Sequence, residues 1–279
     1  MLNNSYKSKI MGNSNDKKNK QKNEKNINNK ENTDEKIEEN EDNSEEEYYW
    51  SVINELNTNV DKMKKNIKKC NKNDELVVLI ESGSLAPPHK MHIGLMEKTK
   101  KFIEENNKNA KVICGFVIPS SDQYVKYKLR EDFINLKHRV NMTKLMVKDS
   151  EWLEYLDWGF AYGEEIKSLL DRIIKKEFPK YKIKSYLVFG IDYYMRHRIP
   201  LNDEHICIYR PGYDLNKAKE MYPNNLIFVE GNEEDISSTL LRKAIREKDE
   251  KIINELTSKE VVDYIKNNDI FANEYHNHC

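Results

Sequence analysis

The stretch LVVLIESGSLAPPHKMH, residues 76–92, decides the fold. It opens with five consecutive strand-forming aliphatic residues and continues into a Pro-Pro pair, which suits the first turn of a helix. The pattern predicts a buried strand over Leu76–Glu81, a short turn, and a helix over His89–Glu105. His89 and His92 would then lie on one face of the helix, beside its unpaired backbone N–H groups.

A histidine pair with this spacing has three interpretations. Zinc usually requires histidines four residues apart or further cysteine and carboxylate ligands, and none is near in the sequence. The pair could also be polar residues that begin a surface helix. We favour the third interpretation, a phosphate site, because a helix N-terminus offers free N–H groups and the positive end of the helix dipole.

The rest of the chain alternates between apolar runs of strand length and amphipathic stretches. The further predicted strands are Val112–Ile118, Ser185–Phe189, His205–Tyr209 and Leu226–Val229. The further predicted helices are Leu129–Val147, Tyr162–Phe178, Ser238–Lys248 and Lys259–Asn267. This alternation predicts an α/β fold, a Rossmann-like and mostly parallel sheet with helices on both faces. Ligands bind beyond the carboxyl ends of such strands, which puts residues 82–92, 119–126 and 190–192 on one rim.

The N-terminal region has a different composition. From about Met11 to Glu47 the chain is almost entirely Asn, Lys, Glu, Asp and Ser, too little apolar surface to offset the entropy of ordering it. We therefore expect a disordered tail over residues 1–47 and a linker or docking helix over 48–75. One folded domain is expected over 76–272, followed by a C-terminal tail over 273–279.

Charge and cysteine content limit the partners and the compartment. The chain has 279 residues, of which 34% are charged, and a formal net charge of −1. It contains no apolar run of the length of a membrane span, so we expect no membrane partner. The lysine-rich first half of the tail could contact nucleic acid, but we favour a solvated low-complexity segment and expect no nucleic-acid partner. Cys114 and Cys207 lie in apolar runs without CxxC spacing. We expect core thiols in a reducing compartment, cytoplasmic or nuclear.

A second motif, EDISSTLLRKAIR at residues 234–246, begins another helix. Ser237 suits the N-cap, Ser238 and Thr239 present hydroxyls, and Arg242 falls about one turn further on. Hydroxyls, free N–H groups and a guanidinium at a helix start can hold the outer phosphates of a nucleotide. Ordinary capping explains the same residues equally well, so the motif alone leaves both interpretations open.

Taken together, GSLAPPHKMH (83–92) and ISSTLLR (236–242) resemble the paired motifs of the HxGH-type nucleotidyltransferase superfamily. Within it, the chain from about Leu76 to Phe271 most resembles the nicotinamide/nicotinate mononucleotide adenylyltransferases of the eukaryotic type. The closer resemblance rests on PSSDQYVKYKL (119–129), HRVNMTKLMVKDSEW (138–152) with a Trp six residues on, GID (190–192) and YRPG (209–212).

The resemblance implies an enzyme that joins the AMP part of ATP to nicotinamide or nicotinate mononucleotide by direct in-line transfer, giving NAD or deamido-NAD and pyrophosphate. It also implies Mg²⁺ with the ATP, a homo-oligomer, and no metal bound by the protein itself. The implied catalytic residues are His89, His92 and Arg242. The implied ATP-binding residues are these three with Gly83, Ser84, Gly190, Asp192, Ser237, Ser238 and Thr239. The implied mononucleotide-binding residues are Tyr124, Lys126 and Trp158, the last as a stacking surface for the pyridine ring.

Several positions depart from the family pattern. Leu85-Ala86 stands where the family has an aromatic residue followed by Asn or Asp, and Gly159 replaces the usual glutamate. Residues 199–206 lack the second pyridine-stacking tryptophan. Leu240 replaces a basic or polar residue, and Glu234 replaces an asparagine. Nearly all of the family's phosphate-binding residues are therefore present, whereas several residues of the mononucleotide-binding pocket differ.

Two alternatives therefore stay open. One is nucleotidyl transfer to a different phosphate acceptor, and the other is a non-catalytic nucleotide-binding or chaperone-like descendant. Tyr193 or Tyr194 could supply the aromatic surface that the acceptor pocket lacks. The choice between the amide and the acid mononucleotide stays open as well.

Overall fold

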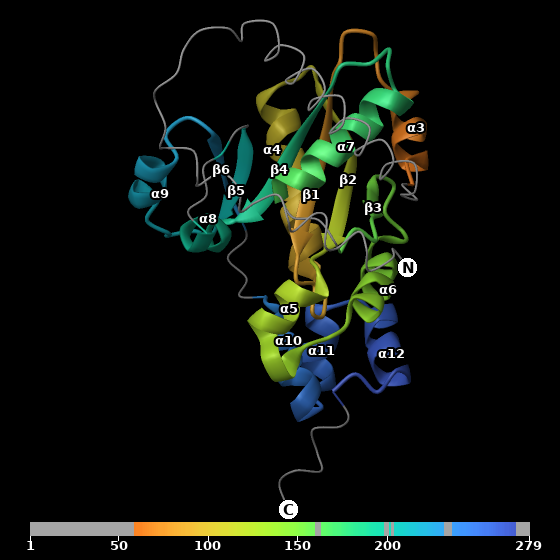
Figure 1. Ribbon diagram of the computed structural model, residues 1–279, viewed down its shortest axis with the longest axis vertical. Helices are drawn as coiled ribbons and strands as arrows, with labels where there is room; N and C mark the ends of the chain where they lie inside the picture. Colours follow the sequence, from red (N-terminus) through yellow and green to blue (C-terminus); the bar gives the residue numbers. More distant parts are fainter. Residues whose placement is uncertain (1–58, 160–162, 198–200, 202–203, 232–235, 272–279) are drawn as a thin grey trace, which may run out of the picture. The chain divides into compact units, whose positions relative to one another are not determined.

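The computed structural model describes residues 59–159, 163–197, 201, 204–231 and 236–271 (Figure 1). The chain divides into two compact units, Met1–Asn57 and Thr58–Cys279, and the described residues belong to the second. The expected tail over 1–47 lies outside the described residues. In the described ranges, no helix has both the length and the apolar character that a membrane crossing needs.

Six parallel strands form one sheet in the described part of the chain. They are β1 (Glu75–Gly83), β2 (Ala110–Pro119), β3 (Leu153–Tyr155), β4 (Ile183–Gly190), β5 (His205–Tyr209) and β6 (Leu226–Glu230). Their order is β3-β2-β1-β4-β5-β6, so the chain builds outward from β1 to one edge and then returns to β1 at β4. The predicted Rossmann-like class is confirmed, with a topological switch point between β1 and β4.

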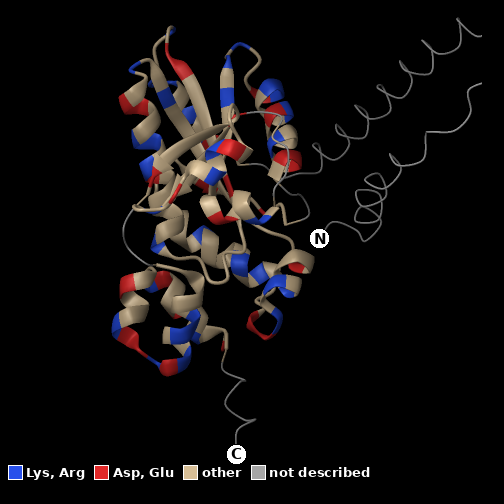
Figure 2. Ribbon diagram, turned by 90° about the vertical axis from the view of Figure 1, so that its left-hand side faces the viewer, with Lys and Arg blue, Asp and Glu red and all other residues tan. Residues whose placement is uncertain are grey.

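Helices cover both faces of the sheet. The crossover helix α4 (Lys90–Asn106) leads from β1 towards one edge, and α7 (Gly163–Glu177) leads back from β3 to β4. Right-handed crossovers that run in opposite directions place these helices on opposite faces, as Figure 1 shows. The core under α4 joins Met96 to strand residues such as Leu79 and Ile206, all of them fully buried. Figure 2 shows acidic and basic residues interspersed along the helices.

The remaining helices gather at the ends of the sheet. Those at the carboxyl ends of the strands are α5 (Asp122–Leu129), α6 (Leu136–Val147), α10 (Ser238–Glu247), α11 (Glu250–Leu256) and α12 (Lys259–Asn267) (Figure 1). A second core contains Ala86, Val125, Met142 and Val261, and it packs α5, α6 and α12 against the loop that follows β1. Two short helices, α8 (Ile191–His197) and α9 (Asn216–Met221), flank β5.

The expected linker or docking helix over 48–75 is, in its described part, a docked helix. Residues Asp61–Ile67 form α3, whose Met63 and Ile67 are buried. Lys62 Nζ donates to the Leu153 carbonyl at 2.5 Å, and Asn66 Nδ2 donates to the Ile113 carbonyl at 3.0 Å. Through these contacts α3 packs against β2 and β3, and the expected domain bounds stay a prediction.

Most predicted elements are confirmed, and one is wrong in part. Of the helix predicted over Leu129–Val147, only α6 (from Leu136) is formed as expected; Leu129 is the last residue of α5, and the 3-10 turn η2 (Arg130–Asp132) follows it. The break has a local cause, because the Asn135 side chain caps α6 by accepting from the His138 N–H at 3.1 Å. Cys114 and Cys207 are buried, as expected of core thiols.

Candidate active site

The loop between β1 and α4 is fixed by side chains from other parts of the chain. Four of its carbonyl oxygens accept hydrogen bonds from α6, α10 and the α11–α12 connection. The donor–acceptor pairs are Arg139–Ser84 at 3.1 Å, Arg242–Ala86 at 2.9 Å, Ser238–Pro87 at 2.9 Å and Thr257–Pro88 at 3.0 Å. Leu85 in the middle has φ 45°, a conformation that non-glycine residues rarely adopt. We call these four contacts the loop clasps; they engage carbonyl oxygens that would otherwise be free to repel a phosphate.

The histidine pair lies where α4 begins. His89 occupies the N-cap position and His92 the first turn, with ring centroids 4.1 Å apart, so the expectation of a shared face is confirmed. Burial, and then the neighbouring His92, lower the pKa of His89 to about 2, which keeps that imidazole neutral. His89 Nδ1 and His92 Nε2 have no hydrogen-bond partner among the described residues. Buried polar atoms of this kind call for an explanation, and a ligand provides one.

Sequence reasoning missed the functional potential of Glu81, which it treated as the end of a strand. Glu81 Oε1 lies 2.6 Å from His92 Nδ1, and the residue is only 4% exposed. The available signal was a carboxylate directly after five aliphatic residues of a buried strand. A buried charge of this kind requires a partner.

The start of α10 lies against the same loop. Ser237 caps the helix by accepting from the Leu240 N–H at 3.2 Å, so the capping interpretation is confirmed. Ser238 is one of the loop clasps, and the Thr239 hydroxyl accepts from Arg242 Nη2 at 3.2 Å. The two motifs that lie far apart in the sequence therefore meet in the fold.

Arg242 is held by protein acceptors. Its Nε lies 2.9 Å from Asp132 Oδ2 and its Nη1 lies 2.9 Å from the Ala86 carbonyl. The residue is 5% exposed. Its side chain therefore supports the loop in this structure, and its predicted contact with ATP stays a prediction.

Helix α5 directs Lys128, rather than the predicted Lys126, towards the β1 loop. Lys128 Nζ donates to Ser84 Oγ at 3.1 Å and lies 5.6 Å from the centre of the Tyr124 ring. Partial burial, followed by repulsion from Arg196 and Arg242, lowers the pKa of Lys128. Both lysines are exposed, and residues two apart on a helix differ by about 200° in direction, so Lys126 points away from the β1 loop.

At the end of β4, the space beside Gly190 is open and the aromatic ring of Tyr193 lies nearby. Among the described residues, no atom lies within 4 Å of the position that a Cβ on Gly190 would occupy, and Asp192 is exposed in the first turn of α8. Tyr193 stacks on Phe189 with ring centroids 4.1 Å apart, whereas Tyr194 is fully buried. Burial, with smaller effects of Tyr124 and Glu164, raises the pKa of Tyr193 to about 12, so its phenol is neutral. Of the two tyrosines, Tyr193 is placed to supply ring surface.

Trp152 and Trp158, the tryptophans of the described residues, lie in the core. Trp152 is 6% exposed and donates to Glu97 at 2.8 Å, which agrees with the core role expected for it. Trp158 is 1% exposed, so in this structure it presents no ring face to a ligand. The departure at Gly159 has a packing reason, because a Cβ there would lie 2.4 Å from Leu136 Cδ2. A glutamate at this position would require the Leu136 side chain at the start of α6 to move.

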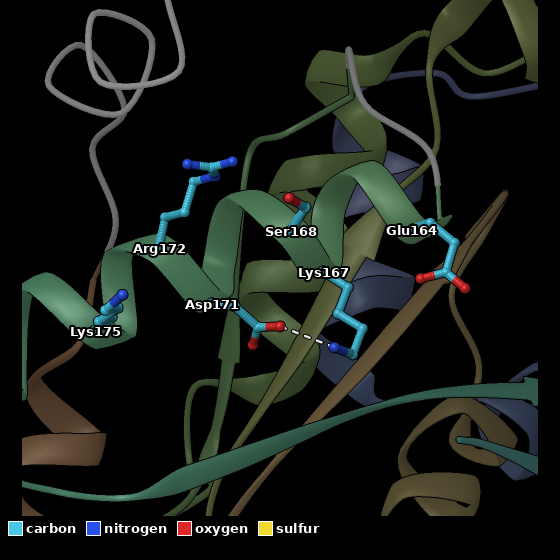
Figure 3. A pocket seen from close by; sticks show the side chains of 6 residues that line it. All are labelled: Glu164, Lys167, Ser168, Asp171, Arg172 and Lys175. Atoms are coloured by element: carbon cyan, nitrogen blue, oxygen red, sulfur yellow. Dashed lines mark hydrogen bonds and ion pairs between the residues drawn. The ribbon is translucent and has the colours of Figure 1, made fainter. Parts of the chain in front are cut away.

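A cavity of about 270 Å³ lies along α7, away from all predicted site residues. Its described lining residues are Glu164, Lys167, Ser168, Asp171, Arg172 and Lys175 (Figure 3). Lys167 and Asp171 form an ion pair at 2.8 Å across one turn of the helix. The groups that face it belong to one charged helix surface, so we assign the site to the strand ends instead.

The fold and the strand-end site define the class: a doubly wound α/β protein whose ligand-facing groups lie at the topological switch point. A family model described as cytidylyltransferase-like matches residues 80–244, more than half of the chain, and the protein belongs to this family. The match includes both the histidine pair and Arg242. Membership of the nucleotidyltransferase superfamily, expected from the motifs, is thereby confirmed.

Curated relatives are similar over different lengths. A bovine protein named nicotinamide/nicotinic acid mononucleotide adenylyltransferase 1 is 38% identical over 82 residues, which is 29% of this chain and 27% of the bovine protein. The chain therefore matches about a quarter of that relative's length. The Arabidopsis thaliana protein named nicotinamide/nicotinic acid mononucleotide adenylyltransferase is 25% identical over 222 residues, covering 70% of this chain and 90% of the plant protein.

Solved structures share the fold. The Plasmodium falciparum nicotinic acid mononucleotide adenylyltransferase complexed with APC has a TM-score of 0.52 and 17% identity, and the match covers 70% of this chain and 97% of that one. The same enzyme complexed with NaAD has a TM-score of 0.51 and 18% identity, with 71% and 98% coverage. At this identity the similarity establishes the arrangement of strands and helices.

Proposed function

We propose that the protein transfers the adenylyl group of ATP to the phosphate of nicotinamide or nicotinate mononucleotide and releases pyrophosphate. The observation that carries this proposal is that the histidine pair and the start of α10 meet on one clasped loop at the β1–β4 switch point. The names of the bovine and Arabidopsis relatives support the choice of substrates.

The step itself needs one bond made and one broken. An oxygen of the mononucleotide phosphate attacks the α-phosphorus of ATP, and the bond from that phosphorus to the bridging oxygen breaks, so that pyrophosphate leaves with the electron pair. The attacking phosphate is already ionised at neutral pH, so no general base is required. The residues of the chain act by positioning the two anions and by stabilising charge on the transferring group. His92 Nε2 is aimed at the phosphoryl oxygens, with His89 beside it.

The ATP site extends in two directions from this point. The adenosine lies over the end of β4, where Gly190 leaves open space and Asp192 is exposed. The outer phosphates lie at the start of α10, which offers Ser238, Thr239 and the free N–H groups of its first turn.

Mg²⁺ enters as part of the nucleotide. Among the described residues, no group of three or more His, Cys, Asp or Glu side chains is arranged to hold a metal. The oxygen atoms of the triphosphate are themselves suitable Mg²⁺ ligands, so the ion belongs to the substrate here. When bound, it neutralises charge on the departing phosphates.

The acceptor phosphate binds beside α5 and α8. Lys128 and Arg196 both approach this region, and their mutual repulsion favours an anion between them. The Tyr193 ring supplies an aromatic surface nearby, and Tyr124 lies beside it. The predicted roles of Lys126 and Trp158 stay predictions; Lys128 and Tyr193 are our candidates for the same tasks.

A second candidate is the same transfer to a different phosphate acceptor. The observation that favours it is the burial of Trp158 together with the close packing of Gly159 on Leu136. Both differences affect the pocket in which the family binds the pyridine ring, and neither affects the residues proposed to bind phosphate.

Pyrophosphate release by the purified full-length chain tests both candidates. The assay contains Mg²⁺ and ATP with nicotinamide mononucleotide, with nicotinate mononucleotide, or with a panel of other phosphate acceptors. We expect release with a pyridine mononucleotide, and NAD or deamido-NAD as the second product. Release with a different acceptor alone would move the substrate and keep the mechanism. ATP binding without release from any mixture would contradict the proposal and favour a non-catalytic descendant.

A further inference from the structure

The buried carboxylate of Glu81 has no part in the transfer step described above, yet it contacts the site. Its Oε1 lies 2.6 Å from His92 Nδ1, and the two side chains are 5% and 15% exposed. An ionised carboxylate can only accept a hydrogen bond, so in this contact Nδ1–H is the donor. The second oxygen, Oε2, has no hydrogen-bond partner among the described residues, so the imidazole is the group that compensates this buried charge.

The two imidazoles have different surroundings. Their ring centroids are 4.1 Å apart, so a positive charge on one ring opposes a positive charge on the other. Burial and the proximity of His92 lower the pKa of His89 to about 2, and His89 is therefore neutral at neutral pH. The carboxylate contacts His92. One histidine thus has a carboxylate neighbour and the other does not, and such a difference in surroundings usually gives two titratable groups different roles in a site.

Charged groups contact either the histidine pair or the loop that precedes it. Glu81 comes from β1, and His89 comes from the start of α4 itself. Lys128 of α5 reaches Ser84, and Arg242 of α10 reaches the Ala86 carbonyl and pairs with Asp132. Of the groups that touch the histidines directly, Glu81 carries the negative charge.

We propose that Glu81 is a positioning residue that makes His92 the charged member of the histidine pair. A neutral His92 whose Nδ1–H donates a hydrogen bond to Glu81 would have an unprotonated Nε2. The lone pair on this nitrogen would repel phosphate oxygens. A second proton on Nε2 turns this atom into a charged donor at the position where negative charge develops. The role rests on the proposed function, since it explains how the site keeps a cation ready for the transferring phosphoryl group.

Ring-nitrogen NMR of the full-length chain, labelled with ¹⁵N-histidine, tests the charge assignment without any substrate. At neutral pH we expect both nitrogens of His92 at imidazolium shifts and those of His89 at neutral shifts, with assignments from His89→Ala and His92→Ala. A neutral His92 in the unmodified chain would overturn the proposal. Because this readout requires no turnover, it remains decisive even when no acceptor releases pyrophosphate.

Kinetics of Glu81→Gln test the consequence, because glutamine keeps the size and removes the charge. We expect turnover at neutral pH to fall about 10- to 100-fold, towards that of His92→Ala, with an unchanged KM for ATP. We also expect partial recovery as the pH is lowered, since protonation of His92 then needs no carboxylate. Wild-type turnover in folded Glu81→Gln would overturn the proposal.

Glu154→Gln is the matched control. Glu154 is 5% exposed on β3 of the same sheet, and its carboxylate lies 3.9 Å from Lys62, outside the site. We expect this variant to keep both its turnover and the His92 signals. Equal losses of turnover in the two variants would overturn the proposal, because they would show that any buried carboxylate of the sheet has the same effect.

Discussion

Arg242 Nη1 donates a hydrogen bond of 2.9 Å to the carbonyl of Ala86, although 156 positions separate the two residues in the sequence. The contact joins the start of α10 to the loop that follows β1. The same guanidinium pairs with Asp132 at 2.9 Å, so one side chain links three segments of the chain. The shape of the candidate active site therefore depends on contacts between a loop that follows the first strand and a helix that follows the last strand of the sheet.

Arg242→Ala should lower the free energy of unfolding as well as activity. The change leaves the buried Ala86 carbonyl without its donor and Asp132 without one of its two partners. We expect a loss of about 2–4 kcal/mol, measured by chemical denaturation. Lys243→Ala is the control, because Lys243 is exposed and forms a surface pair with Glu247 at 3.9 Å. Similar stability of the two variants would contradict the role of Arg242 as a loop clasp.

Asp132→Asn should change how stability depends on pH. Although burial opposes it, hydrogen bonds and charge from Arg246 and Arg242 lower the pKa of Asp132 in the folded protein. A carboxyl with a lowered folded-state pKa stabilises the fold above its ordinary pKa, and this contribution is lost as the pH falls through the lowered value. We expect the stability difference between wild type and Asp132→Asn to be constant above about pH 5.5 and to shrink below about pH 4. A difference that is the same at acidic and neutral pH would refute the assignment.

Lys128→Ala and Lys126→Ala should separate the two candidate phosphate ligands. Loss of a charged hydrogen bond to a phosphate costs about 1.5–3 kcal/mol, so the KM for the mononucleotide should rise roughly 10- to 100-fold in Lys128→Ala. The exposed Lys126 serves as the control, with an expected KM close to that of the wild type. Since the pKa of Lys128 is lowered, its contribution should be lost as the pH rises, earlier than for an ordinary lysine. The reverse ranking of the variants would restore Lys126 to the role that the family resemblance implies.

Trp158→Ala should act on folding before it acts on binding. The indole is 1% exposed, and removal of a buried aromatic side chain typically costs about 3–5 kcal/mol. We expect this loss in a denaturation experiment, with the KM for the mononucleotide little changed in the folded fraction. A variant of normal stability with weak mononucleotide binding would instead support a stacking surface.

The elements that the sequence predicts best are those with local signals. The strand His205–Tyr209 and the helix Lys259–Asn267 have their predicted bounds, and the helix starts at the Ser258 cap. Strand β3 was missed because it is a three-residue strand at the edge of the sheet, too short to show a pattern. Helix α5 is not among the predicted helices, although Ser121 caps it by accepting from the Tyr124 N–H at 3.2 Å.

Site residues were predictable where a motif names them, and not where geometry selects them. The histidine pair and the α10 hydroxyls follow from their spacing and from helix starts. The choice between Lys126 and Lys128 depends on the direction of α5, a helix that the sequence pattern does not predict. Glu81 belongs to a strand covered on both faces, and in such strands alternation does not reveal which side chain meets a ligand.

The loop clasps also determine when the site can exist during synthesis. Three of the four come from Ser238, Arg242 and Thr257, which follow the last strand of the described sheet. The ribosome delivers a chain from its N-terminus at about 5–20 residues per second, so every strand emerges before these donors do. A nascent chain can therefore complete its sheet while the loop between β1 and α4 still lacks three of its four clasps, and the loop takes its final shape only after the segment from α10 to α12 has emerged.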